Sequence, residues 1–408
     1  MNNKTKKLKK KKESKVIKFF NRIIKGNKIK YTTWDTIIFM IIVFGFGLIV
    51  GGIIIYSKDI NRSSLNEFIA TYDELIDNYY QKVNKDELLE AGISGMVKYL
   101  GDPYSTYMNK TDAVDFNEGV DGTYQGIGAE IKYNESNLPA IGEVFENSPA
   151  EKAGLKENDI ILKVNDVDVK DKSLSEIADI VKGNSGTKVN MTIKHDNEEK
   201  TLTIERAVVD NISVFSEVIN SNNKKIGYIY ISIFASNTTK QFKEKLVKLE
   251  NEKIDSLIID VRGNTGGYLT TVTDIISMFT KKGDIIYKLK TKDKIEDITD
   301  KTIESRDYPV VILADSGSAS ASEVLTGAFR EIYNAKVIGD KTYGKGKIQK
   351  IFALSSGALL KYTYQEWLTP NGNYIDGMGI TPDIEVKYEY ISDGKDSQKN
   401  KAIEVLSK

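Results

Sequence analysis

The sequence predicts a layered α/β core that carries an inserted, β-rich module. Between about residues 226 and 386, buried strands alternate with amphipathic helices, an order typical of a sheet covered by helices. A shorter stretch, residues 118–207, contains glycine-punctuated strands, the first of them expected from Tyr124 to Tyr133. It also contains two short helices, one with Ser148 as its N-cap and Pro149 at its first position, and one at about 174–181. In front of both the core and the module lies a run without a charge, residues 36–57, which is long enough to span a bilayer as a helix.

Composition excludes several kinds of catalytic centre. The 408 residues contain no Cys and one His, His195, so thiol nucleophiles, zinc–thiolate sites and multi-histidine metal sites are excluded. We expect no metal and no other cofactor, and any hydrolytic chemistry must then use Ser, Thr, Lys, Asp or Glu. His195 lies near a strand end in the β-rich module, and we interpret it as an ordinary residue of that strand.

The basic charge of the chain is concentrated at its start. Residues 1–34 carry twelve Lys, one Arg and one Glu, about +12 in a chain of net charge zero, so a nucleic-acid partner for the whole chain is not supported. The excess of Lys and Arg before the apolar run predicts a basic cytoplasmic tail at 1–35 and a transmembrane helix at 36–57. The rest of the chain is then expected outside the cell membrane, at a bacterial cell surface. A cleaved signal peptide is the alternative, which the length of the apolar run disfavours.

Helices are predicted on both sides of the folded domains. Residues 58–117 read as a helical arm, because large apolar side chains recur there at helical spacing up to the turn signal Gly101-Asp102-Pro103. Residues 391–408 read as a C-terminal helical segment. The arm serves as a spacer or as a contact for a neighbouring module or a second subunit, and the sequence favours the spacer, with a homodimer left open.

Three loops follow buried strands of the core domain, whose predicted span is 208–390. They read RGNTGG from Arg262, DSGSASAS from Asp315 and TYGKGK from Thr342. Ligand sites in such sheets gather at the carboxyl ends of strands, so we expect these loops to form one site. Nucleotide binding is disfavoured, because Gly346 stands where a phosphate-binding loop needs Ser or Thr.

Ser320 is the candidate nucleophile, and the residues alone leave Ser318 and Ser322 of the same run as alternatives. Ser320 sits among small residues at the predicted start of a helix, where a substrate backbone can approach and free N–H groups can stabilise an oxyanion. The N–H of Ala321 is one natural donor, and Gly266 or Gly267 could supply the second.

A serine nucleophile needs a base, and lysine is the conventional choice that remains here. Such a lysine must be neutral near pH 7, although the pKa of a free lysine is about 10.4. Lys345 is flanked by glycines that let the backbone pack closely while the side chain enters a pocket. Lys347 is the rival base, and spacing alone does not separate the two.

The order of these motifs resembles the C-terminal processing peptidases, also called tail-specific proteases. A glycine loop and the run SPAEKAGLKENDIIL resemble a PDZ domain, and RGNTGG, GSASASE and TYGKGKIQ follow in the family order over about residues 65–408. The resemblance implies an α/β crotonase-like (ClpP-like) protease core with an inserted PDZ domain. It also implies a Ser–Lys dyad and a cofactor-free serine endopeptidase mechanism.

The resemblance assigns roles to individual residues. Ser320 matches the nucleophile, Lys345 matches the base, and Gln349 matches a glutamine that orients the lysine, although IQKIFAL reads as a strand. The oxyanion donors match Gly266 and Gly267, beside Ala321. The terminal carboxylate of a bound peptide is expected at five residues of the PDZ loop: Tyr124, Gln125, Gly126, Ile127 and Gly128.

These inferences predict a membrane-anchored serine endopeptidase that recognises the C-terminal tails of protein substrates through its PDZ domain and cleaves them through an acyl-enzyme. The first alternative is a non-catalytic, membrane-tethered PDZ scaffold, and the second is a crotonase-like enzyme that handles acyl-CoA. The strand LLKYTYQEWL departs from the Thr-rich sequence usual in the family. That departure could alter the substrate channel while it leaves the dyad intact.

Overall fold

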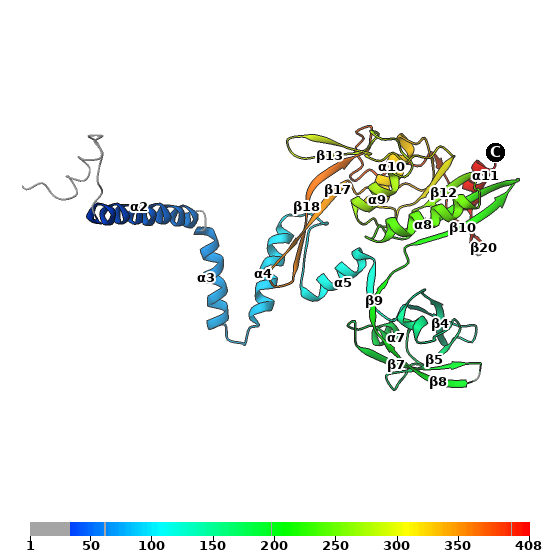
Figure 1. Ribbon diagram of the computed structural model, residues 1–408, viewed down its shortest axis with the longest axis horizontal. Coiled ribbons are helices and arrows are strands. Elements are labelled where there is room, and N and C mark those ends of the chain that lie inside the picture. The colour runs from blue at the N-terminus through cyan, green and yellow to red at the C-terminus, as the bar shows by residue number, and fades with distance from the viewer. Residues whose placement is uncertain (1–32, 61–62, 197, 393) are drawn as a thin grey trace, which may run out of the picture. The chain divides into compact units, whose positions relative to one another are not determined.

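The computed structural model describes residues 33–60, 63–196, 198–392 and 394–408, shown in Figure 1. The chain divides into two units, residues 1–92 and 93–408. Residues 1–32, most of the predicted basic tail, lie outside the described residues.

The first unit is helical. It contains α2 (Thr33–Ile60), α3 (Ser63–Asn78) and the first part of α4 (Lys85–Tyr99). Across the ranges that the structure describes, no helix combines the length and the apolar character needed to cross a membrane. The transmembrane helix expected at 36–57 is therefore not borne out.

The second unit is built on a six-stranded sheet with the strand order β10-β11-β12-β15-β16-β19. The first pair is antiparallel, and the other pairs are parallel. The strands are β10 (Val214–Ser221), β11 (Lys224–Ile231), β12 (Ser256–Asp260), β15 (Val310–Ala314), β16 (Lys336–Gly339) and β19 (Ile384–Glu385).

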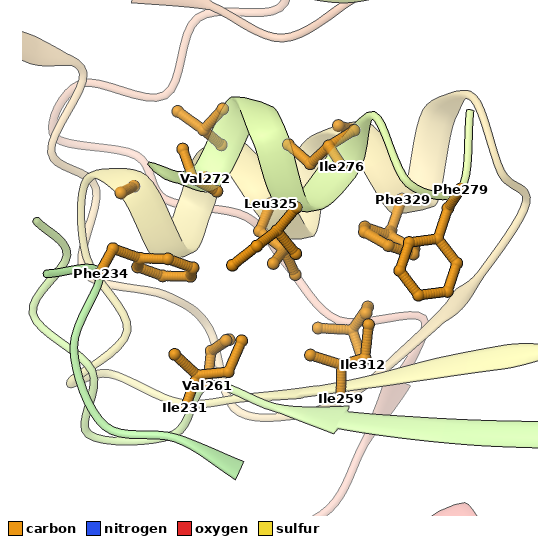
Figure 2. Close-up of a cluster of buried hydrophobic side chains, with 14 of the residues drawn as sticks. Ile231, Phe234, Ile259, Val261, Val272, Ile276, Phe279, Ile312, Leu325 and Phe329 are labelled. Carbon is orange, nitrogen blue, oxygen red and sulfur yellow. The ribbon is translucent and has the colours of Figure 1, made fainter. Parts of the chain in front are cut away.

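Both faces of this sheet are covered, which explains why its central strands are nearly continuous aliphatic runs. Figure 2 shows Ile259 and Ile312 on one face, below side chains of the helices that cover it. Ile258 points to the opposite face and packs with residues of the C-terminal helix. The helices are α8 (Thr238–Asn251), α9 (Leu269–Ile276) and α10 (Ala321–Glu331) on the first face, and α11 (Ser397–Leu406) on the second.

A second sheet of five strands flanks the core. Its order is β1-β18-β13-β14, and β17 pairs with β18. The strands are β1 (Thr106–Met108), β13 (Ile285–Lys290), β14 (Ile295–Thr299), β17 (Lys347–Ala353) and β18 (Leu359–Leu368). β1 lies in the stretch expected to be a helical arm, and its pairing with β18 brings the preceding loop, 102–105, to the core. The helix α5 (Lys110–Asp121) follows it.

The β-rich module has a sheet of its own, with the order β3-β4-β5-β7-β8 and β6 beside β5. The predicted helix at 174–181 is confirmed as α7 (Leu174–Val181), and Ser148 caps α6 (Pro149–Lys152) as expected. The strand expected from Tyr124 is broken in two, because β2 pairs with β9 outside the module's sheet. The strands are β2 (Thr123–Gly126), β3 (Ala129–Tyr133), β4 (Pro139–Val144), β5 (Ile160–Val164), β6 (Val167–Asp168), β7 (Lys188–His195), β8 (Glu198–Glu205) and β9 (Ala207–Asp210).

Candidate active site

Ser320 occupies a strained backbone position between β15 and α10. Its φ of 56° and ψ of −114° lie where a residue with a Cβ is uncommon, at a cost of about 1–3 kcal/mol. Its N–H donates to Oε2 of Glu323 at 2.9 Å, which helps to hold this conformation. The neighbouring serines are bonded elsewhere: Oγ of Ser318 donates to the carbonyl of Val261, and Oγ of Ser322 donates to that of Asn264, both at 2.7 Å.

A cavity of about 500 Å³ brings Ser320 together with most of the residues predicted for the catalytic site, and Ala321 is not among the residues that line it. Ser320, Lys345, Gln349, Gly266 and Gly267 all line it. Its remaining walls are largely apolar or aromatic and come from α5, the start of α9 and the β17–β18 pair, including Phe116, Val120, Ile233, Leu269, Ile351, Tyr364 and Trp367.

The two candidate lysines differ in the direction of their pKa shifts. Burial lowers the pKa of Lys345, and the charge of Lys361 lowers it further, while Asp102 and Glu323 act in the opposite direction. Hydrogen bonding to Glu366 raises the pKa of Lys347, which also pairs with Asp376 at 3.3 Å. Only Lys345 therefore shows the shift that a lysine base requires.

The Lys345 side chain is half-buried above an aromatic ring. Its Nζ lies 4.9 Å from the ring centroid of Tyr104, in the loop before β1. Its backbone carbonyl accepts a hydrogen bond from the indole of Trp367 at 3.0 Å. Among the residues that the structure describes, Nζ of Lys345 has no hydrogen-bond or ion-pair partner, so no protein acceptor occupies this amine in the cavity.

Glu323, which the sequence motifs did not single out, connects Ser320 to the loop that carries Lys345. This carboxylate is fully buried and accepts four hydrogen bonds. The donors are the N–H groups of Ser320 (2.9 Å), Gly344 (2.7 Å) and Lys345 (2.8 Å) and the hydroxyl of Thr342 (2.6 Å). The signal was present, because Ser320 followed three residues later by Glu matches a helix capping box.

The expected oxyanion donors are not equivalent. The N–H of Gly266 already donates to Oδ1 of Asn264 at 2.8 Å. The N–H groups of Ala321 and Gly267 have no acceptor within the described ranges. Gly266 instead provides close packing, because a Cβ there would lie 2.9 Å from Cβ of Ser320. The geometry thus favours Ala321 and Gly267 as the donor pair over Gly266.

Gln349 lies on β17 and lines the cavity. Its Nε2 donates to Oγ1 of Thr363 on β18 at 3.3 Å. In the described part of the chain, no hydrogen bond joins it to Lys345, so its role in orienting the lysine stays a prediction.

The PDZ module has a groove of about 470 Å³ between β3 and α7. Tyr124, Gly126 and Ile127 line this groove, as expected. Gln125 and Gly128 do not. The Gln125 side chain bonds to Glu118 and to the N–H of Ser185 instead.

The Tyr124 ring is folded over the loop that was expected to hold a peptide carboxylate. A Cβ on Gly126 would lie 2.7 Å from this ring. Burial raises the pKa of Tyr124, and backbone hydrogen bonds from Gly128 and Ala129 oppose that shift. In this structure the Tyr124 hydroxyl therefore lies near the backbone N–H groups of Gly128 and Ala129.

His195 is an ordinary residue of the module, as the sequence indicated. Its Nδ1 lies 2.5 Å from Oδ1 of the buried Asp159. This partner belongs to the PDZ module, so the histidine is engaged away from Ser320.

Comparison with known proteins agrees with this arrangement. Residues 225–386 match peptidase family S41, residues 141–195 match the PDZ domain, and residues 56–112 match the activating protease CtpB N-terminal domain. A probable CtpA-like serine protease of Staphylococcus haemolyticus is 37% identical over 386 residues, covering 91% of this chain and 77% of that protein.

Two further relatives extend the comparison. A probable CtpA-like serine protease of Staphylococcus aureus (strain MRSA252) is 38% identical over 338 residues, covering 81% of this chain and 67% of that protein. The crystal structure of a putative S41 protease from Bacteroides fragilis shares the fold at 17% identity, with a TM-score of 0.51 over 81% of this chain and 91% of that chain. The chain therefore belongs to the C-terminal processing peptidases of family S41 and is a serine-type peptidase with a PDZ domain.

Proposed function

We propose that the chain is an endopeptidase in which Ser320 attacks the peptide bond and Lys345 is its general base. One observation carries this proposal. The strained Ser320 and the only nearby lysine with a lowered pKa among the described residues line the same cavity, while Ser318, Ser322 and Lys347 are bonded elsewhere.

The mechanism follows from this geometry. Neutral Lys345 takes the proton of the Ser320 hydroxyl as Oγ attacks the substrate carbonyl carbon. The N–H groups of Ala321 and Gly267 stabilise the oxyanion. The lysine ammonium then gives its proton to the leaving amine, and the peptide C–N bond breaks. A water molecule, deprotonated by the same lysine, hydrolyses the ester and restores the serine. Gln349 orients the lysine in this proposal.

We further propose that substrates are protein chains with exposed C-terminal tails. The groove beside β3 supports this, because β4 is the only strand paired with β3 in the described part of the chain, which leaves one edge open to an added strand. The carboxylate of the tail would accept hydrogen bonds from the N–H groups that lie near the Tyr124 hydroxyl. The crotonase-like character of the core is part of the same proposal and is supported by the helix-covered parallel sheet.

Attachment to the cell membrane, with the catalytic part outside, is proposed on the sequence alone. The 22-residue uncharged run and the basic segment before it support this proposal, and the structure adds no support. Alkaline carbonate extraction of membranes and protease treatment of intact cells test it. Release of the chain by carbonate would contradict it.

A homodimer also stays a prediction, which sedimentation analysis of the purified protein would test.

Cleavage of an unfolded protein substrate with an apolar C-terminus tests the proposed mechanism. We expect Ser320→Ala and Lys345→Met to lose cleavage while they still bind a C-terminal peptide, and Lys347→Met to retain most of it. Full cleavage by either of the first two variants would overturn the dyad. If the wild-type chain binds peptides but cleaves none of them, the non-catalytic scaffold is the better description.

A further inference from the structure

Lys361 is a positive charge in the active-site cavity that the mechanism does not use. It lies on β18, where it pairs with Ile351 of β17, and it lines the same cavity as Ser320 and Lys345. Its Nζ lies 5.2 Å from the ring centroid of Phe116, on α5. Within the described ranges, Lys361 has no carboxylate partner. Lys347, in contrast, is neutralised by Glu366 and Asp376.

The groups around Lys345 shift its pKa in opposite directions. Asp102 before β1 and Glu323 on α10 favour its charged form, and the face of the Tyr104 ring attracts a cation as well. Burial and the charge of Lys361 favour the neutral form. Two nearby carboxylates would keep a lysine protonated, so a base at this position needs a charge that offsets them.

The surroundings of Lys361 suit this task. Contact with the Phe116 ring holds its ammonium in place through a cation–π interaction, which leaves the positive charge intact. A salt bridge would instead cancel the field that it exerts on Lys345. The cavity walls are largely apolar, so this field is less screened than it would be on the surface.

We propose that Lys361 is a positioning residue that keeps Lys345 in its neutral, proton-accepting form by placing a second, unpaired positive charge in the cavity. This inference rests on the proposed function, because it acts through Lys345. The inference also assigns a role to the strand LLKYTYQEWL, which departs from the Thr-rich sequence usual in the family and carries Lys361. The competing role for the residue is to bind an acidic group of the substrate.

The test is the pH profile of kcat/KM from about pH 5 to about pH 10, whose acidic limb reports the base in the free enzyme. We expect Lys361→Gln to move this limb to higher pH. At pH values on this acidic limb, the kcat/KM of the variant should be on the order of tenfold lower than that of the wild type. At high pH the two values should become equal. Lys361→Arg keeps the charge and should restore the wild-type profile.

A second neutral variant and a control variant complete the test. Lys361→Met keeps the apolar contact with Phe116 and should behave like Lys361→Gln, so poor folding of one variant leaves the other to decide. Lys350→Gln removes an exposed charge from the same strand pair without lining the cavity, and should leave the limb in place.

Each remaining outcome contradicts a different statement. An unmoved limb in both neutral variants overturns the inference. A higher KM confined to acidic substrates, without a moved limb, assigns Lys361 to substrate binding and also overturns it. Cleavage by Ser320→Ala would instead contradict the proposed function, so the two failures are distinguishable.

Discussion

Glu323 should be the most sensitive residue outside the reacting pair. It accepts two hydrogen bonds on each carboxylate oxygen, from Thr342 and Gly344 on Oε1 and from Ser320 and Lys345 on Oε2. Glu323→Gln keeps the shape but replaces one oxygen by an NH₂ group that cannot accept. A single isosteric change therefore tests whether this carboxylate couples Ser320 to Lys345, the proposed nucleophile and base.

The expected cost follows from where the NH₂ group would go. At the Oε2 position it would face two backbone N–H donors, whereas at the Oε1 position it would face only one, because the Thr342 hydroxyl can rotate and accept. The second arrangement leaves the buried N–H of Gly344 unpaired. We therefore expect Glu323→Gln to lower the free energy of unfolding by about 1–3 kcal/mol.

Catalysis should suffer more than stability, because the same carboxylate positions the backbone of Ser320 and Lys345. The assays are urea unfolding followed by circular dichroism and kcat/KM for peptide cleavage under folding conditions. Glu244→Gln, on the exposed face of α8, is the matched control and should change neither quantity. If Glu323→Gln matches this control in both assays, the connecting role assigned to Glu323 is wrong.

Three further predictions follow from the site, the second sheet and the groove. Gly266→Ala should abolish most cleavage, since its Cβ would lie 2.9 Å from Cβ of Ser320, while Gly263→Ala, which also has a positive φ but has open space around its Cβ, should keep it. Lys347 and Tyr374 lower the pKa of Glu366 to about 2 from 4.5, so its contribution to stability is present above pH 4.5 and lost as pH falls through about 2. Glu366→Gln should make the free energy of unfolding depend less on pH between about pH 2 and pH 4.5, and an unchanged pH dependence would contradict the pairing. Tyr124→Phe removes the hydroxyl that lies near the N–H groups of Gly128 and Ala129 and should tighten binding of a C-terminal peptide by roughly 1 kcal/mol in fluorescence anisotropy, whereas weaker binding would show that the hydroxyl assists the ligand.

The sequence was a good guide wherever one element decides its own structure. Continuous aliphatic runs marked the parallel strands, and Ser148 and Pro149 marked a helix start, because these signals depend only on nearby residues. The choice of Ser320 over its neighbours came from a family resemblance. The structure adds a physical reason, since Ser318 and Ser322 bond to backbone carbonyls of the adjacent loop.

Features that depend on long-range pairing could not be predicted. Nothing local indicates that residues 106–108 pair with 359–361, and that pairing brings Tyr104 beneath Lys345. Spacing could not separate Lys345 from Lys347 either, because the difference lies in carboxylates contributed by residues 366 and 376. The loss of Gly266 as an oxyanion donor likewise depends on a side-chain bond, from Asn264, that periodicity does not reveal.

The most direct test of the central claim is to locate the residue that a serine-reactive fluorophosphonate modifies, by mass spectrometry of the digested protein. The proposed dyad predicts modification of Ser320 alone. The rate should fall sharply in Lys345→Met and remain nearly unchanged in Lys347→Met. Modification of another serine, or equal rates in wild type and Lys345→Met, would contradict the assignment of Ser320 and Lys345 as nucleophile and base.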